Sequence, residues 1–154
     1  MKQKYYESAG GVVLDARGGV LLLERYVPRE DGLRHEVRLP KGHIDSGETV
    51  EEAALREVCE ESGYCEVEVL APLGENTVEY EHRGELVTRK EHYFLMRLRR
   101  DKRRKPDVAP NSEEALFEVR WASDLTEAEN LLTYDGEKLF CRRAQEAREG
   151  FGKR

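Results

Sequence analysis

Three closely spaced glutamates carry the most suggestive chemistry in this sequence. Glu57, Glu60 and Glu61 lie in the stretch "LREVCEESGY" (55–64), and residues three or four apart share one face of a helix. Like charges at that spacing repel by roughly 0.2–0.5 kcal/mol per pair. Such a face is either left in water or neutralised by a cation. Hard divalent ions such as Mg²⁺ bind carboxylate oxygens together with substrate phosphates.

The neighbouring residues predict how this helix begins, ends and is braced. Thr49 starts a capping-box pattern and Gly63 supplies a usual C-terminal end. The preceding loop, 39–47, contains two glycines that allow the backbone to approach a ligand closely. Arg56 points to a different side of the helix, where we expect it to pair with Glu48 and order the loop.

The spacing of residues over the longer segment 42–64 distinguishes between a solvated acidic surface and a cation site. The segment "GHIDSGETVEEAALREVCEESGY" (42–64) resembles the Nudix box at every defining position. The resemblance implies a Nudix hydrolase, an α/β/α sandwich with a mixed sheet, a catalytic loop-helix and a C-terminal helix. Such an enzyme cleaves a diphosphate linkage with Mg²⁺ or Mn²⁺ as its cofactor.

The same resemblance implies roles for the residues of the box. Glu57 and Glu61 are expected to bind the metal, with the backbone at Gly42 beside them, and Glu60 is a further ligand or the base that activates water. Metal-bound water becomes a nucleophile near neutral pH, and the metal offsets charge on the phosphates. Arg56 and Glu48 keep a structural role in this interpretation.

Some members of the family take the catalytic base from a late loop instead. Glu113 and Glu114 precede the last expected strand and are the candidates for that role. A solvated pair of loop residues is the alternative, and the sequence leaves this choice open.

Basic and aromatic residues outside the box are candidates for holding the substrate. Base–aromatic stacking is worth about 1–3 kcal/mol per base. Simple exposure is the alternative for the basic residues, and core packing is the alternative for the aromatic ones. The candidates are Lys41, His43, Arg89 and Lys90 for phosphates, and Tyr93 and Tyr134 for a base.

Shorter matches point to a branch of the family. "SAGGVVL" and "LPKGHIDSGE" are similar to the bis(5′-nucleosyl)-tetraphosphatases and diphosphoinositol polyphosphate phosphohydrolases, and "HYFLM" and "LLTYDGEKLF" resemble prokaryotic diadenosine tetraphosphate hydrolases. One position departs from the pattern, because Val37 stands where an aromatic residue is common. The resemblance therefore favours hydrolysis of a nucleoside polyphosphate, with diadenosine tetraphosphate cut to ATP and AMP.

Other functions remain open within the same family. The alternatives are hydrolysis of diphosphoinositol polyphosphates, ADP-ribose or oxidised nucleotides, removal of pyrophosphate from RNA 5′ ends, and non-catalytic nucleotide sensing. The full set of box glutamates argues against a sensor, because a binding module does not need the complete metal constellation.

Composition limits the class of protein. The 154 residues fit one domain (1–154), with 38% hydrophobic and 38% charged residues. The net charge of −6 argues against general nucleic-acid binding. A small phosphorylated substrate stays compatible with this charge if metal ions or local basic residues offset the repulsion. The oligomeric state is not indicated.

Cysteine usage and hydropathy suggest a cytoplasmic protein. Cys59, Cys65 and Cys141 are odd in number and form no C-x-x-C motif, so we expect reduced thiols. No apolar run approaches the ~20 residues that a membrane span needs, and residues 1–10 contain no apolar signal region.

The remaining pattern predicts the elements that position these residues. Strands on both sides of a central helix indicate a mixed α/β sandwich, and the lack of regular β-α alternation argues against a Rossmann fold. The expected elements are two strands in 8–26 with a turn at 17–19, mostly loop in 29–48, alternating strands in 65–100 with turns at Gly74 and 83–84, a charged loop at 99–112, a last strand at 113–123, and helices at 123–132 and 134–150.

Overall fold

The structure is a computed structural model that describes residues 2–152, with side chains to residue 150. Within this part of the chain, no helix is long and apolar enough to cross a membrane. The elements are β1 (Lys2–Leu14), β2 (Val20–Arg29), β3 (Gly32–Arg38), β4 (Lys41–His43), α1 (Val50–Ser62), β5 (Val67–His82), β6 (Glu85–Leu98), the 3₁₀ helix η1 (Glu113–Leu116), β7 (Glu118–Ala122), α2 (Leu125–Leu131) and α3 (Asp135–Gly152).

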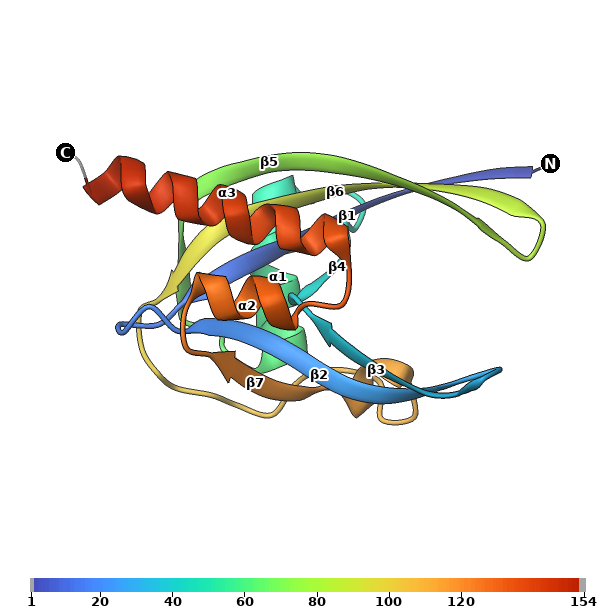
Figure 1. Ribbon diagram of the computed structural model, residues 1–154, viewed down its shortest axis with the longest axis horizontal. Helices are drawn as coiled ribbons and strands as arrows, with labels where there is room; N and C mark the ends of the chain where they lie inside the picture. The colour runs from blue at the N-terminus through green and yellow to red at the C-terminus, as the bar shows by residue number, and fades with distance from the viewer. Residues whose placement is uncertain (1, 153–154) are drawn as a thin grey trace.

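A mixed sheet lies between two helical layers. Its strand order is β3-β2-β1-β6-β5, with β4 paired to β1 and β7 paired to β2. The pairing of β1 with β6 is parallel and the others are antiparallel. Helix α1 packs on one face through Ala53, Ala54 and Val58, while α2 and α3 cover the other face (Figure 1). The predicted α/β/α sandwich is confirmed.

The divergence of β1 from β2 opens the sheet. These strands pair only at Leu14 and Val20, beside a turn in which the Asp15 carboxylate accepts hydrogen bonds from the backbone N–H groups of Arg17 and Gly19. Beyond the turn, β1 pairs with β6 along its full length and β2 pairs with β3. The β2–β3 and β5–β6 hairpins therefore spread apart as they extend from the core (Figure 1).

Helix α1 forms as its flanking residues predict. The Thr49 hydroxyl accepts a hydrogen bond from the N–H of Glu52 at 3.1 Å, and the Glu52 carboxylate accepts one from the N–H of Thr49 at 3.0 Å. Gly63 ends the helix with a left-handed φ of 84°, which favours glycine because it has no Cβ. The expected capping box and C-terminal glycine are both confirmed.

Three predictions of strand structure are wrong in detail. Segment 29–48 is not mostly loop, because β3 pairs with β2 across a short hairpin and β4 pairs with β1. No turn occurs at Gly74, where a shift of register between Pro72 and Glu75 lets β5 continue. The strand expected over 113–123 begins only at Glu118, after η1.

The expectation of reduced cysteines is also wrong for two of the three. Cys59 and Cys65 form a disulfide across the end of α1, with Cα atoms 4.3 Å apart. The left-handed turn at Gly63 reverses the chain and brings Cys65 back beside the helix, a proximity that cysteine spacing alone does not indicate. Cys141 is free and buried, and burial raises the pKa of its thiol to about 12.

Thiol labelling should distinguish these cysteines. Alkylation of unfolded protein without a reductant is expected to modify only Cys141, whereas alkylation after reduction should modify all three cysteines. Intact-mass spectrometry counts the labels directly. The Cys141→Ser variant serves as the control and should give none and then two. Three labels on unreduced protein would show that the disulfide does not form.

Candidate active site

The Arg56 guanidinium joins the loop to the acidic face of α1. It donates to Glu48 at 2.6 Å and 2.9 Å, to Glu57 at 2.8 Å and to Glu60 at 3.0 Å, and it also donates to the backbone carbonyl of His43 at 2.9 Å. The expected Arg56–Glu48 ion pair is therefore present. It has wider contacts than expected, because the same side chain also offsets repulsion between Glu57 and Glu60.

A second part of the acidic face is buried against β4. The Glu61 carboxylate accepts a hydrogen bond from the backbone N–H of Lys41 at 2.7 Å. The Glu57 carboxylate packs so closely on Gly42 that a Cβ at this position would overlap it. Burial raises the pKa of Glu61 to about 8, and the neighbouring Glu57 contributes to this rise. Burial also raises the pKa of Glu57, although Arg56 opposes the effect.

These residues fit a divalent cation in their chemistry. Among the side chains that the structure describes, no three acidic, histidine or cysteine groups converge as a ready ligand set. Glu57 and Glu61 nevertheless place two carboxylates in a poorly solvated site, and Arg56 contacts only the first of them. Oxygen donors with uncompensated charge are what Mg²⁺ or Mn²⁺ prefers, with the backbone at Gly42 within contact of Glu57.

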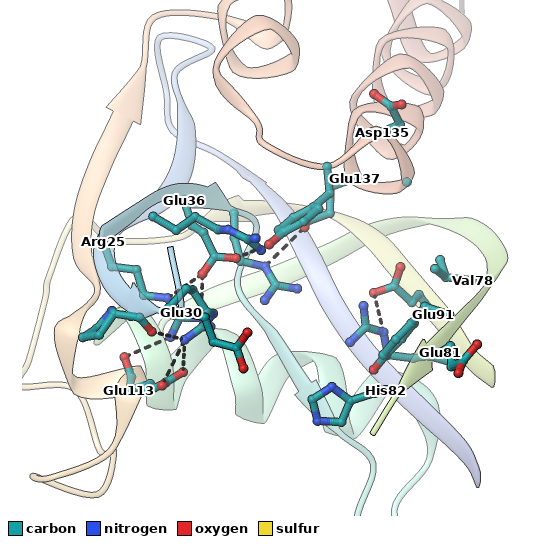
Figure 2. Close-up of a pocket in the computed structure, with 18 of the residues that line it drawn as sticks. Arg25, Glu30, Glu36, Val78, Glu81, His82, Glu91, Glu113, Asp135 and Glu137 are labelled. Atoms are coloured by element: carbon teal, nitrogen blue, oxygen red, sulfur yellow. Dashed lines mark hydrogen bonds and ion pairs between the residues drawn. The ribbon is translucent and has the colours of Figure 1, made fainter. Parts of the chain in front are cut away.

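A large cleft opens between the two diverging hairpins. It has a volume of about 1540 Å³. Figure 2 shows Arg25, Glu36 and Glu113 on one side, Glu91 and His82 on the other, and the start of α3 above them. Charged residues of both signs line the cleft. The arginines are Arg25, Arg29, Arg34, Arg38, Arg83 and Arg89, and the carboxylates are Glu30, Asp31, Glu36, Glu81, Glu91, Glu113, Asp135 and Glu137.

Buried ion pairs build one wall of this cleft. Arg25 donates to Glu36 at 2.9 Å, and both side chains are buried. The Tyr134 hydroxyl donates to the same carboxylate, with its ring 5.1 Å from the Arg38 guanidinium. Glu137 pairs with Arg38 at 3.3 Å and accepts a hydrogen bond from the Leu39 N–H at 2.6 Å. These contacts fasten the start of α3 to β3 and to the loop before the box.

Sequence reasoning missed most of these wall residues. Arg25, Glu36, Arg38 and Glu137 are charged and therefore look like surface residues. The available signal is the alternation of residues in 32–38, inside the segment 29–48 that the sequence predicts as mostly loop. Val37, the departure from the family pattern, is buried in this strand. Its N–H donates to the Thr133 hydroxyl at 2.8 Å, and its carbonyl accepts a hydrogen bond from the Thr133 N–H at 3.0 Å.

Lys41 connects the two regions. While its N–H contacts Glu61, its ammonium lies 3.7 Å from Glu91 on the cleft floor. Burial, together with the nearby Arg38 and Arg89, lowers the pKa of Lys41 to about 8. The loop that precedes α1, residues 39–47, and the cleft are therefore adjacent.

The structure sorts the predicted substrate residues. Tyr134 lines the cleft. The stacking role expected for Tyr93 is wrong, because its ring is 1% exposed and packs on Phe140, with ring centroids 4.4 Å apart. His43 is exposed beside Tyr6, outside the lining of the cleft.

The other predicted polar residues also separate. Arg89 lines the cleft, whereas Lys90 pairs with Glu75 at 3.3 Å and does not line it. Glu113 borders the cleft and pairs with Arg29 at 3.1 Å. Glu114 is exposed and outside the lining. The geometry therefore favours Glu113 over Glu114 as a late-loop base.

Comparison with known proteins establishes the family. A model of the NUDIX domain matches residues 4–140, so this chain belongs to the NUDIX family. MutT4 of Mycobacterium tuberculosis is 40% identical over 102 residues, which cover 63% of this chain and 40% of the mycobacterial protein. An RNA pyrophosphohydrolase of Vibrio vulnificus is 29% identical over 129 residues, covering 77% of this chain and 71% of that protein.

Solved structures agree with this assignment. The Ap4A hydrolase of Caenorhabditis elegans is 26% identical, with a TM-score of 0.61, and the match covers 93% of this chain and 98% of that one. Its binary complex matches with a TM-score of 0.67 at 24% identity, over 95% of this chain and 99% of that one, which supports the fold.

The stability of the metal-free protein should depend on Glu61. Its pKa is about 8 in the folded chain and near 4.5 when exposed, so the folded state binds the proton more tightly. The stability that this proton contributes is present below about pH 4.5 and is lost as pH rises through about 8. In EDTA, the melting temperature should therefore fall between pH 5 and pH 8.5, and the fall should be larger for wild type than for Glu61→Gln. Mg²⁺ should reverse much of the wild-type loss. Parallel pH curves for the two proteins would contradict this assignment.

Proposed function

We propose that this chain is a metal-dependent pyrophosphohydrolase that acts on nucleoside polyphosphates. The favoured substrate is diadenosine tetraphosphate, hydrolysed to ATP and AMP. One water molecule is consumed, a bridging phosphorus–oxygen bond breaks, and two protons are released when both products are fully ionised. The observation that carries this proposal is the position of Lys41, whose N–H contacts Glu61 of the box and whose ammonium lies beside Glu91 in a cleft that contains six arginines.

The loop and helix supply the groups for the reaction. A bound divalent ion would neutralise phosphate charge and make water more acidic, and Glu57, Glu61 and the Gly42 backbone are the groups that would hold it. Arg56 orients Glu57 and Glu60 through short ion pairs. Such fixed dipoles and charges favour a transition state when they are set before substrate binds.

Two residues are suitable for accepting the proton of the attacking water. Glu60 belongs to the box and is only partly buried, with Arg56 at 3.0 Å. Glu113 borders the cleft and pairs with Arg29. The pH dependence of kcat reports the groups that ionise in the enzyme–substrate complex. The base is therefore the residue whose replacement by Gln, Glu60→Gln or Glu113→Gln, removes the rise of kcat with pH.

The charges of the cleft support a polyphosphate substrate. Guanidinium groups match phosphate geometry and remain protonated at all relevant pH values. Arg34 and Arg83 lie near the tips of the two hairpins, and Arg38 and Arg89 lie closer to Lys41. A chain of several phosphates spans such a row of cations better than a single phosphate does.

The names of the relatives suggest a second candidate substrate. The Caenorhabditis structure is named an Ap4A hydrolase and the Vibrio relative an RNA pyrophosphohydrolase. Both names describe cleavage beside a nucleotide. A substrate panel that includes diadenosine tetraphosphate and a 5′-triphosphorylated RNA, with product identification, decides between them.

Replacing the box glutamates should abolish turnover without unfolding the chain. Glu57→Gln, Glu60→Gln and Glu61→Gln are each expected to lower kcat by orders of magnitude, because each removes a metal ligand or the base. Release of ATP and AMP, followed by chromatography, measures the effect. Glu114→Gln is the control, since this exposed side chain lies outside the cleft lining. Near-normal rates in all three variants would refute the site.

Tyr134 should contribute to binding more than to chemistry. Tyr134→Ala is expected to raise KM for diadenosine tetraphosphate by roughly tenfold to a hundredfold, on the scale of one base stack, and barely change kcat. Tyr134→Phe keeps the ring and loses the hydroxyl that contacts Glu36. It should therefore remain closer to wild type. If both variants raise KM equally, the contact with Glu36 and not stacking is responsible.

A further inference from the structure

Two buried polar atoms of residues that line the cleft, Glu91 Oε2 and Arg89 Nε, form no hydrogen bond among the described residues. Glu91 is 2% exposed, and its carboxylate lies 3.4 Å from Arg89 and 3.7 Å from Lys41. Unpartnered buried polar groups are rare in folded proteins and call for an explanation. A ligand that supplies the missing partners is one such explanation.

The start of α3 places a glycine over this nearly buried carboxylate, which lies in the lining of the cleft. Gly136 lies above Glu91, and a Cβ there would come within 3.7 Å of Glu91 Oε1 and 3.3 Å of Asn76 Nδ2. A larger side chain at Gly136 would extend over the carboxylate. Figure 2 shows Glu91 on the opposite side of the cleft from Glu36, with Asp135 and Glu137 above.

The chemistry of the cluster restricts its ligand. An ionised carboxylate only accepts hydrogen bonds. Arg89 and Lys41 pair with Glu91 at 3.4 Å and 3.7 Å without forming a hydrogen bond to it, so a ligand that donates one would complete its contacts. The phosphates of the proposed substrate are themselves acceptors and cannot fill that role. The sugar hydroxyls of a nucleotide can donate to the carboxylate and accept from the Arg89 guanidinium at the same time. A carboxylate that binds a ribose 2′-hydroxyl is a recurring solution in nucleotide-binding proteins.

We propose that Glu91, together with Arg89, binds the sugar hydroxyls of the nucleotide and makes the chain selective for ribonucleotides over deoxyribonucleotides. This inference rests on the proposed function, in that the substrate is a nucleotide. Lys41 places the sugar beside the reaction centre, because its ammonium lies near Glu91 while its N–H contacts Glu61. The sugar next to the phosphates held at the loop that precedes α1 is therefore the one that is recognised.

A simpler role for Glu91 makes a different prediction. If the carboxylate only positions Lys41 and Arg89 for phosphate binding, its replacement should weaken all nucleotides equally. If it binds a hydroxyl, the loss should be confined to nucleotides that carry this hydroxyl. The two roles are therefore separable by comparing sugars on one protein.

The experiment measures binding in the absence of turnover. Titration calorimetry with ATP, 2′-deoxy-ATP and 3′-deoxy-ATP, in EDTA, is carried out on wild type, Glu91→Gln and the matched control Glu75→Gln. Glu75 is a neighbouring exposed carboxylate that pairs with Lys90. Wild type and the control should prefer ATP over at least one deoxy form by roughly tenfold to a hundredfold, as expected for a hydrogen bond to a charged group. Glu91→Gln should lose most of this preference by weakening ATP alone.

Each other outcome overturns the inference. It fails if wild type binds the three nucleotides equally or binds none, or if Glu91→Gln weakens all three to the same extent. If Glu91→Gln is poorly folded by circular dichroism, Gly136→Val covers the carboxylate from above and should remove the same preference. The titration measures binding and the substrate assay measures cleavage, so the two proposals can fail separately. A ribose preference without diphosphate cleavage would contradict the proposed function and leave this inference standing. Cleavage without sugar preference would do the reverse.

Discussion

The candidate active site depends on one guanidinium group. Without Arg56, the loop at His43 and the carboxylates of Glu57 and Glu60 would have no common partner, and the acidic face of α1 would repel itself. The planar fork of arginine presents several donors in fixed directions, so a single side chain holds the loop and the helix together. A cation that enters the site meets carboxylates already oriented by Arg56, and it adds charge where burial leaves Glu61 poorly solvated.

A second constraint comes from the sheet. Because β1 and β2 pair at a single position, the sheet cannot close between the two hairpins, and the opening becomes the cleft. On the edge of β1 that faces β2, residues 8–10 pair with β4, while β6 pairs with the opposite edge of β1. The strand that carries Lys41 and Gly42 is therefore placed between the helix with the glutamates and the floor of the cleft. The topology itself brings the reactive groups and the binding groups together.

The parts that were predictable from sequence are those with local physical causes. The capping box at Thr49, the glycine end at Gly63 and the spacing of the glutamates all act within a turn or two of the chain. The missed features depend on where the chain folds back on itself. Glu36 and Glu137 look like surface residues until Arg25, across the β2–β3 hairpin, and Arg38, about a hundred residues away from Glu137, are placed beside them. Strand β3 and the Cys59–Cys65 disulfide have partners close in sequence, but each needs a reversal of the chain that the residue pattern alone does not indicate.

The box is one continuous segment, whereas the cleft is assembled from several parts of the chain, and this contrast bears on how substrate selectivity arises. The relatives matched here have names that refer to different substrates, and the same family model covers nearly all of this chain. Reaction chemistry that resides in one continuous segment can be kept while the cleft changes. The cleft walls come from four separate parts of the chain, 25–38, 78–91, Glu113 and 134–137, and the Arg38–Glu137 ion pair joins the first of them to the last. A substitution in these walls alters which molecule fits beside Lys41 and leaves the Arg56 contacts to the box intact. The identity of the substrate must therefore be read from the side chains that face one another across the cleft, since the box specifies only the bond to be broken.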